Sequence, residues 1–337
     1  MWNLLIAINR KLIISIPIMM LAGFLFGRGL RPEFTSLVRV LILPLTFLMV
    51  YPMMVTLNIK HLREGIKNIK LQIMTQCINF GVIPFIAYGL GLYFFPHQPY
   101  MALGLLLAAL LPTSGMTISW TGFAKGNMGA AINMTVIGLT LGSVATPFYI
   151  QTLMGAKVDV NFVLIIKQIV IIVFLPMFLG FITRQWLIKK YGQQEFKKNL
   201  GPKFPALSTI GVLGIVFVAI ALKAKTIAAN PTILGSIFVP LFIVYLVNFL
   251  LSTLAGKLFF NRGDAIALVY GTVMRNLSIA LAIAINTFGA AGAETALVIA
   301  VSYIIQVQAA AWYVKLTDTV FGPIMVAPET VHLTKEI

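Results

Sequence analysis

The sequence predicts an all-α membrane protein with ten transmembrane helices, arranged as two inverted five-helix repeats in which helices four and nine are broken and cross. Of its 337 residues, 59% are hydrophobic and 10% are charged, and the mean hydropathy is +0.96. Soluble domains carry about 25% charged residues, so the composition excludes a soluble fold. A helical span needs about 20 apolar residues, which leaves room for ten spans and no large soluble domain.

Charge-poor runs bounded by basic or turn residues mark the expected spans. The sixth span contains Lys167, close enough to its outer end to snorkel to the interface. Two prolines, Pro96 and Pro99, predict a tight turn between the third and fourth spans. The ten expected spans are Leu12–Gly27, Val40–Ile59, Leu71–Phe95, Met101–Ala124, Met128–Met154, Asn161–Thr183, Phe204–Leu222, Ile233–Ala255, Ala265–Asn286 and Thr295–Val314.

The basic residues predict the orientation in the membrane. The net charge is +16, from 25 basic and 9 acidic residues. Seventeen basic residues fall on the N-terminal side of the alternating spans and seven on the opposite side, so we expect a multi-pass cell-membrane protein with both termini cytoplasmic. Because these charges lie in short loops, we expect the lipid bilayer and no nucleic acid as a partner. The seven are Arg28, Arg31, Arg39, Lys157, Lys167, Lys223 and Lys225.

Two pairs of short segments suggest an internal repeat. Leu12–Pro17 resembles Ile171–Pro176, and Gly126–Ala131 resembles Gly289–Glu294. Inverted repeats of this kind build many transporters. Each half holds five spans, an odd number, so the second half must cross the membrane in the opposite sense. We therefore expect repeats at residues 1–156 and 157–320, followed by a cytoplasmic tail at residues 321–337.

The fourth and ninth spans are interrupted at their centres. In the fourth, Pro112 removes a backbone donor and Gly115 weakens the next turn, so the helix should stop near Leu111 and restart near Ser114. In the ninth, the segment Thr272–Asn276 is polar and charged. Two interrupted spans in corresponding positions predict a transport site near the midplane, where half-helix N-termini favour anions. For the fourth span, a kink that only shapes the helix stays open as an alternative.

Arg275 lies in the middle of the ninth span. A charge at the bilayer centre costs from about 2.5 to more than 10 kcal/mol, so such residues are functional by default. The alternative is a structural arginine that binds carbonyls at the break. None of the nine acidic residues or three histidines lies in the middle of a span, although Asp264 sits at the mouth of the ninth. The interior therefore carries a fixed positive charge, and it lacks the carboxylate that usually couples transport to Na⁺ or H⁺.

Several motifs carry a family resemblance. They are Tyr51–Met54 in span two, Asn79 before Pro84, Asn276–Ser278 at the second break, and Trp120–Asn127, which is close to a W-x-x-L-A-K-G-D pattern. With these motifs the chain resembles the bile acid:sodium symporter superfamily, and the last motif is similar to that of its arsenite efflux branch. The resemblance implies a core of spans three to five and eight to ten against a panel of spans one, two, six and seven, with the substrate between them.

The chain departs from this family at positions that the resemblance implies are ligands. Arsenite exporters have a cysteine where Thr113 stands and a glutamate where Ser278 stands. Sodium symporters have a glutamate and a glutamine where Gly271 and Arg275 stand. Both thiolate capture of arsenite and two-sodium coupling therefore lose key ligands.

Two further positions bear on the site that the resemblance implies. Of the polar residues that the symporters supply from span five, Thr135 remains, its neighbour is Ala131, and Asn133 can contribute instead. The single cysteine, Cys77, lies in span three, and we expect it to be a small buried core residue.

These observations predict a secondary transporter of a small organic anion that works by alternating access without sodium coupling. Arg275 either pairs with the substrate or stands as a tethered cation where relatives bind sodium. An arsenite or other oxyanion efflux permease and a sodium-coupled, bile acid-type symporter stay open as alternatives, as does a channel. No P-loop is present for an ATP-driven pump, and no acid–base pair is present in the interior for an enzyme.

The predicted site needs no cofactor and no metal ion. The sequence leaves open the substrate, the direction of transport and the oligomeric state. The residues predicted to bind the small anionic substrate are Thr113, Ser114, Arg275, Asn276, Ser278, Asn79, Asn133 and Thr135.

Overall fold

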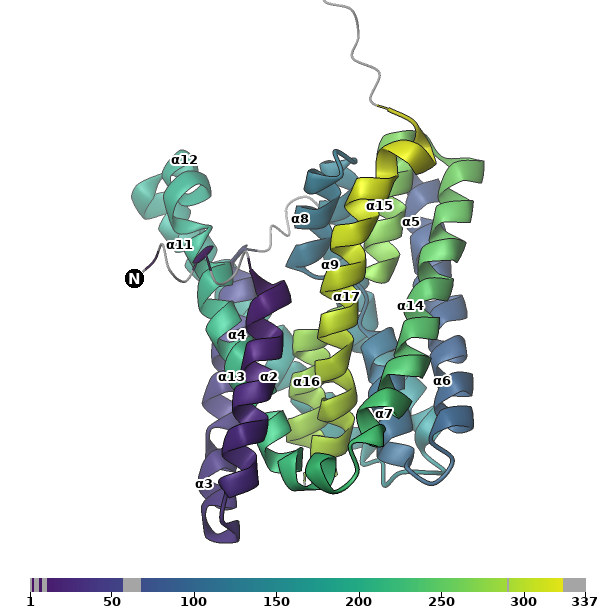
Figure 1. Ribbon diagram of the computed structural model, residues 1–337. Helices are drawn as coiled ribbons and strands as arrows, with labels where there is room; N and C mark the ends of the chain where they lie inside the picture. The colour runs from purple at the N-terminus through teal and green to yellow at the C-terminus, as the bar shows by residue number, and fades with distance from the viewer. Residues whose placement is uncertain (1, 3–5, 8–10, 57–67, 290, 324–337) are drawn as a thin grey trace, which may run out of the picture.

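The chain folds as a bundle of helices (Figure 1). The computed structural model describes residues 2, 6–7, 11–56, 68–289 and 291–323. In this part of the chain every regular element is helical, as the composition predicts, apart from one isolated bridge between Pro112 and Arg275. The expected tail falls mostly on residues 324–337 and the expected second span ends at residues 57–59, and both lie outside the described residues.

The helices lie over the expected spans, with shifted ends. Those of the first half are α2 (Leu12–Gly29), α3 (Thr35–Val40), α4 (Ile42–Thr56), α5 (Ile69–Gln76), α6 (Ile83–Phe94), α7 (Pro99–Leu110), α8 (Gly115–Phe123) and α9 (Met128–Tyr149). Those of the second half are α10 (Phe162–Ile169), α11 (Leu175–Tyr191), α12 (Gln193–Glu195), α13 (Lys203–Ala229), α14 (Thr232–Phe259), α15 (Arg262–Val273), α16 (Leu277–Thr287) and α17 (Gly292–Phe321).

Seven continuous helical segments of the described chain are long and apolar enough to cross a membrane. Three shorter apolar helices accompany them, namely Ile14–Gly29, Pro99–Leu110 and Leu277–Thr287. The last two belong to the broken spans, where neither half is long enough to cross alone. The arrangement of ten spans in two inverted repeats therefore stays a prediction.

A proline explains one irregularity in the third span. Between α5 and α6 the chain forms a π-helical turn, Cys77–Val82. Pro84 has no backbone N–H, so the carbonyl of Phe80, four residues earlier, loses its usual helical partner. The hydroxyl of Tyr149, at the end of α9, donates to this carbonyl at 2.6 Å. The irregular turn thus joins the third span to the fifth.

The helices form two groups that pack most extensively within themselves. The panel group comprises α2, α4, α11 and α13, and the core group comprises α5–α9 and α14–α17 (Figure 1). Small residues allow close packing inside the panel group, because a Cβ atom at Gly27 of α2 would lie 2.3 Å from the carbonyl oxygen of Ala221 in α13. We call the contact between the two groups the seam.

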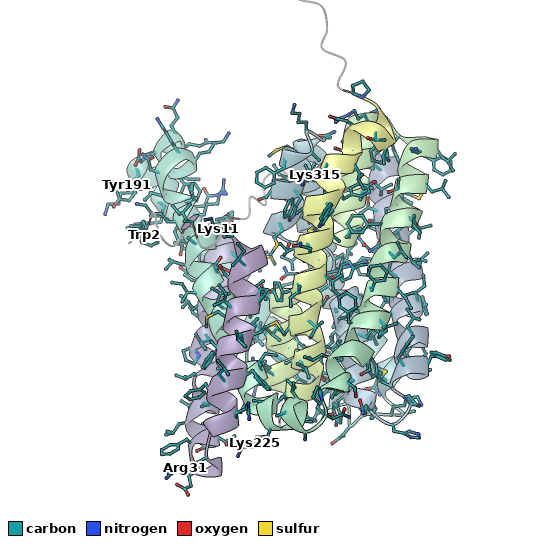
Figure 2. The ribbon with its side chains drawn as sticks, in the orientation of Figure 1. Trp2, Lys11, Arg31, Tyr191, Lys225 and Lys315 are labelled. Carbon is teal, nitrogen blue, oxygen red and sulfur yellow. The ribbon has the colours of Figure 1, made fainter. Side chains whose placement is uncertain are left out.

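Basic residues mark the two ends of the bundle. Lys11 and Lys315 lie at one end, and Arg31 and Lys225 lie at the other (Figure 2). We call these the Lys315 end and the Lys225 end. The separation agrees with the sides that the alternating spans assign to these four residues. That the Lys315 end faces the cytoplasm still rests on the charge count.

Candidate functional site

The first break lies between α7 and α8. Helix α7 ends at Leu110, and Ser114 caps the start of α8, as the sequence predicts. The hydroxyl of Ser114 accepts from the backbone N–H of Met116 at 3.2 Å, and the hydroxyl of Thr117 accepts from the N–H of Ser114 at 3.1 Å. This capping box satisfies donors that the interrupted helix would otherwise leave unpaired inside the bundle.

The second break lies between α15 and α16. Helix α15 ends at Val273, and Asn276 caps α16 by accepting from the N–H of Ile279 at 3.2 Å. The amide nitrogen Nδ2 of Asn276 is buried and makes no hydrogen bond within the described protein. This side chain therefore keeps one donor unused at the break.

The two breaks pair with each other through their backbones. The N–H of Thr113 donates to the carbonyl of Met274, and the N–H of Asn276 donates to the carbonyl of Leu111, each at 2.7 Å. These bonds make the antiparallel bridge between Pro112 and Arg275. Orphan groups of one broken helix thus satisfy those of the other, which non-helical backbone at membrane depth requires. We call this region the crossover.

Gln306 of α17 completes the crossover. Its Oε1 accepts from the N–H of Arg275 at 2.8 Å, and its Nε2 donates to the carbonyl of Arg275 at 3.2 Å. The hydroxyl of Tyr245 in α14 also donates to this Oε1, at 2.9 Å. Since Arg275 bonds to Gln306 on the side away from Pro112, the glutamine amide acts as a third strand, and the main chain of Arg275 is held on both sides.

The side chain of Arg275 is sealed in the core group. The residue is 3% exposed, and its Nη1 and Nη2 atoms are buried without a hydrogen bond in the described protein. Among the described acidic residues only Asp264 is buried, and it binds elsewhere. Arg275 therefore has no carboxylate partner in this part of the chain.

Helix α9 supports the crossover from behind. Cβ atoms at Gly138 and Gly142 would lie 2.8 Å from Thr113 Oγ1 and 2.8 Å from Pro112 Cδ, so only glycine admits this approach. Thr113 has a φ of +65°, a left-handed conformation that threonine rarely adopts. Its hydroxyl donates to the carbonyls of Pro112 at 2.6 Å and Thr135 at 3.2 Å. The bonds hold a strained residue at the break.

Asn79 and Thr135 contact the elements of the crossover through hydrogen bonds, Ser278 lies in the first turn of α16, and Asn133 lies in α9 two residues before Thr135. Asn79 donates to the carbonyl of Gly271 at 3.1 Å, near the end of α15, and its Oδ1 is buried without a partner in the described chain. Ser278 shares a 2.6 Å hydrogen bond with Tyr303. The hydroxyl of Thr135 donates to its own helix, while the Oδ1 of Asn133 is buried and, among the described residues, unpartnered.

The predicted polar residues differ in whether their hydrogen-bonding atoms are already paired inside the protein. The hydroxyls of Thr113, Ser114, Ser278 and Thr135 each make an internal hydrogen bond, although the hydroxyl of Ser114 acts there only as an acceptor. Unused polar atoms remain on Arg275 and on the asparagines Asn79, Asn133 and Asn276.

Sequence reasoning missed polar residues on α14 and α17. On α14, Tyr245 bonds to Gln306, Asn248 donates to the carbonyl of Thr272 at 2.9 Å, and Ser252 shares a hydrogen bond with the hydroxyl of Thr272. Residues 245, 248 and 252 lie on one face of a helix, as do residues 302 and 306 of α17. These polar stripes in otherwise apolar spans were the available signal.

The expectation for Cys77 is wrong. The residue is exposed, on the outer face of the third span. In a membrane protein the surface toward lipid is as apolar as the interior, so a small apolar residue carries no signal of burial.

Asp264 forms a second polar cluster, at the start of α15. Its Oδ1 accepts from Asn127 at 2.7 Å, and its Oδ2 accepts from Asn68 at 2.8 Å and Asn261 at 3.0 Å. Each asparagine also uses its Oδ1 to cap a helix, namely α9, α5 and α15 respectively. Three helix N-termini, with their partial positive charges, thus converge on one carboxylate. We call this the Asp264 cluster.

In the described residues, no group of three His, Cys, Asp or Glu side chains comes together as a metal site would need. The chemistry at the crossover is therefore that of a buried positive charge and unpaired amides. This set suits recognition of an anion through its charge.

Comparison with known proteins identifies relatives among transporters. A sequence model of the Sodium Bile acid symporter family matches residues 43–230. The uncharacterized transporter slr0944 of Synechocystis sp. is 26% identical over 278 residues, covering 76% of this chain and 72% of that protein. Arsenical-resistance protein Acr3 of Alkaliphilus metalliredigens is 26% identical over 273 residues, covering 76% of each chain. Sodium/bile acid cotransporter 7 of Xenopus tropicalis is 23% identical over 239 residues, covering 67% of this chain and 66% of that protein.

Proposed function

Since the chain belongs to the Sodium Bile acid symporter family, and is thus a secondary transporter rather than an enzyme, we propose that it moves a small organic anion by alternating access without sodium coupling. The observation that carries this proposal is Arg275, a buried positive charge at the crossover with no carboxylate partner in the described chain.

The burial of Arg275 supports the role of a tethered cation. Both terminal nitrogens of the guanidinium are closed to solvent, so a substrate cannot form a direct ion pair with them in this conformation. The charge still acts through the crossover, because two opposite unit charges attract by about 4 kcal/mol at about 4 Å and still by about 2 kcal/mol at about 8 Å, at an effective dielectric of 20. An anion at the mouth of the crossover is thus stabilised without touching the arginine.

The same charge opposes sodium binding. A sodium ion at this site would meet neutral amide and carbonyl oxygens and no carboxylate of the described chain, since Asp264 is engaged in its own cluster. Repulsion from the guanidinium at about 4 Å is also about 4 kcal/mol, roughly a thousandfold in affinity. Arginine does not lose its proton at working pH, so the repulsion is permanent.

The alternating-access part of the proposal assigns motion to the two helix groups. Ten spans in two inverted repeats, residues 1–156 and 157–320, would place the crossover near the midplane with both termini in the cytoplasm. The substrate site would then lie where the core group faces the panel group, beside Ser114, Asn276 and Ser278. Packing that is more extensive within each group than across the seam supports movement of one group against the other.

Efflux of arsenite is the second candidate, supported by the similarity to two Acr3 arsenical-resistance proteins. Thr113 argues against it. Its hydroxyl proton is shared between the carbonyls of Pro112 and Thr135, and an alcohol offers no thiolate to bind arsenic.

Two linked experiments test the proposal. Purified protein is first screened by thermal unfolding against taurocholate, pyruvate, acetate, sulfate and arsenite, since a ligand that binds the folded state raises its stability. The stabilising compound is then followed into proteoliposomes. We expect an organic carboxylate to stabilise the protein and to enter in a saturable manner. Stabilisation and flux with arsenite alone would favour the second candidate.

A further inference from the structure

The seam is closed by helix contacts at the Lys225 end. Across the seam, α17 packs against α13 and α2, and α16 packs against α4. Helix α16 is the half of the ninth span that points toward this end (Figure 1). A transporter that alternates between two sides must separate these contacts in its other conformation.

An ion pair crosses the seam at this end. The Nζ of Lys223, late in α13, lies 2.9 Å from Oε1 of Glu294, in the first turn of α17. The two side chains are 16% and 34% exposed, so water screens the pair only in part. A pair of this kind shifts the ratio of closed to open forms by about two- to fivefold. It can bias the seam toward closure without locking it.

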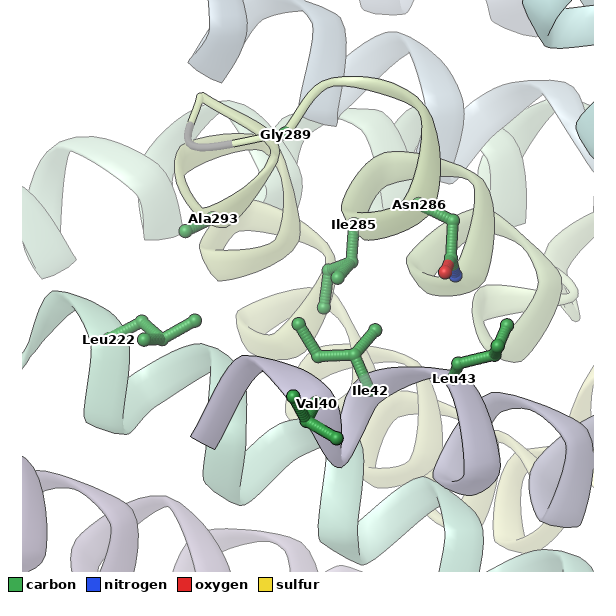
Figure 3. Close-up of a pocket in the computed structure, with 8 residues that line it drawn as sticks. All are labelled: Val40, Ile42, Leu43, Leu222, Ile285, Asn286, Gly289 and Ala293. Carbon is green, nitrogen blue, oxygen red and sulfur yellow. The ribbon is translucent and has the colours of Figure 1, made fainter. Parts of the chain in front are cut away.

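The packing beside this pair is incomplete. A cavity of about 450 Å³ lies in the seam, and the side chains of Ile42 and Ile285 point toward one another across it (Figure 3). Near it, the amide of Asn286 reaches across to the hydroxyl of Thr46 at 3.3 Å. The lining of this cavity comes from both helix groups: Val40, Ile42, Leu43, Leu222, Ile285, Asn286, Gly289 and Ala293. Val40 and Leu43 are 70% and 63% exposed, so the cavity opens to the molecular surface, and widening it breaks fewer contacts than separating a close-packed interior would.

We propose that Lys223 and Glu294 form a latch that holds the panel and core groups together at the Lys225 end and releases when the transporter opens to that side. The proposal rests on the proposed alternating access. Leu222 and Ala293, the chain neighbours of the two charged residues, line the cavity, so breaking the ion pair should widen the cavity directly.

A second ion pair provides a matched control. Arg262 pairs with Asp318, and it also donates to the carbonyls of Gly322 and Lys125. All four residues belong to the core group or its loops, at the Lys315 end. Loss of this pair should loosen the core locally without changing the seam.

Accessibility of a single cysteine tests the latch. Cys77→Ser gives a cysteine-free protein, and Ile285→Cys then places one thiol in the cavity. The rate of labelling by a charged maleimide is measured on detergent-purified protein, so the orientation in the membrane does not matter. We expect Glu294→Gln and Lys223→Gln each to raise this rate about two- to fivefold. The double exchange Lys223→Glu with Glu294→Lys should return it close to the original rate.

The controls separate the latch from the transport proposal. Asp318→Asn should leave the labelling rate of the Ile285→Cys protein unchanged. The melting temperature of each variant is measured, and labelling rates are compared only between variants with equal melting temperatures. If neither single neutralisation changes labelling, or if the exchanged pair labels as fast as the single variants, the latch does not exist. If the latch variants label faster but the protein transports no anion, the latch proposal holds and the proposed function is wrong.

Discussion

Two buried charges of this protein, Asp264 and Arg275, are held in opposite ways. The carboxylate of Asp264 accepts hydrogen bonds from three asparagines, and each of these caps a helix. The backbone N–H and C=O of Arg275 both pair with Gln306, yet the terminal nitrogens of its guanidinium bind no atom of the described protein. The hydrogen-bonding capacity of the carboxylate is used, whereas that of the guanidinium ends stays available.

This difference separates a structural role from a functional one. Removing one partner of a satisfied buried group leaves the others unpaired and lowers stability. Removing an unpartnered buried charge relieves a desolvation cost, so stability should not fall. We therefore expect changes at Asp264 to act on folding and changes at Arg275 to act on transport.

Replacing Arg275 should have the largest effect. Arg275→Gln keeps polarity but removes the charge, and we expect transport of the anion found in the stability screen to fall by about a hundred- to a thousandfold. Arg275→Lys keeps the charge without the planar fork of donors and should retain part of the flux. Flux is measured in proteoliposomes and thermal unfolding in detergent. If Arg275→Gln unfolds as easily as an Asp264 variant, the arginine is structural.

Removing the Asp264 carboxylate should have the next largest effect, on stability. Asp264→Ala leaves three asparagine amides without their acceptor, and we expect the free energy of unfolding to drop by about 3 kcal/mol. Asp264→Asn keeps one acceptor oxygen and should cost less. The protein that remains folded should transport at close to the normal rate. A flux that falls further than the folded fraction would give Asp264 a role in transport.

Gln306 links the two kinds of role, because it is a structural residue that fixes the backbone of Arg275. Gln306→Leu leaves the N–H and C=O of Arg275 unpaired, which should cost about 2 kcal/mol of stability and about tenfold in flux. Gln306→Glu keeps the acceptor for the N–H of Arg275 but loses the donor to its carbonyl, so we expect stability to fall by about 1 kcal/mol, while the added carboxylate should offset the buried charge and strongly reduce flux. Both variants are assayed by thermal unfolding and by flux in proteoliposomes. Normal flux in the Gln306→Glu variant would show that the charge at Arg275 is not used.

The helix cap at the first break should give the smallest effect. Ser114→Ala removes the cap of α8, which should lower stability by about 1 kcal/mol. Thr113 and Ser114 are both predicted to bind substrate. The double alanine variant should therefore lose more free energy of substrate binding than free energy of unfolding. The reverse pattern in a ligand titration followed by thermal unfolding would make both residues purely structural.

The positions of the two helix breaks could be predicted from the sequence, because they depend on local chemistry. Pro112 and Gly115 break a helix through their backbone properties, and Asn276 at the end of the polar run can cap a new helix with its side chain, and the structure breaks at these points. Helix ends are less well predicted. Helix α11 continues to Tyr191, beyond the expected Thr183, because Lys and Arg end an apolar span but are good helix formers.

Pairing between distant segments could not be predicted. Gln306 lies 31 residues from Arg275, and nothing in either segment specifies that they meet. The prediction for Cys77 is wrong for a related reason, since hydropathy does not separate lipid-facing from interior positions. The sequence could locate the charge of Arg275, but only the packed structure locates the partners of its backbone.

Sodium dependence tests the central account most directly, namely that Arg275 stands in place of a bound cation. Uptake of the identified anion is measured in proteoliposomes with sodium and with sodium replaced by choline, for the unmodified protein and for Arg275→Gln. We predict equal uptake in both media for the unmodified protein, because the guanidinium excludes sodium. Uptake that collapses in choline and recovers with sodium would contradict the account and make Arg275 a structural residue turned away from the site.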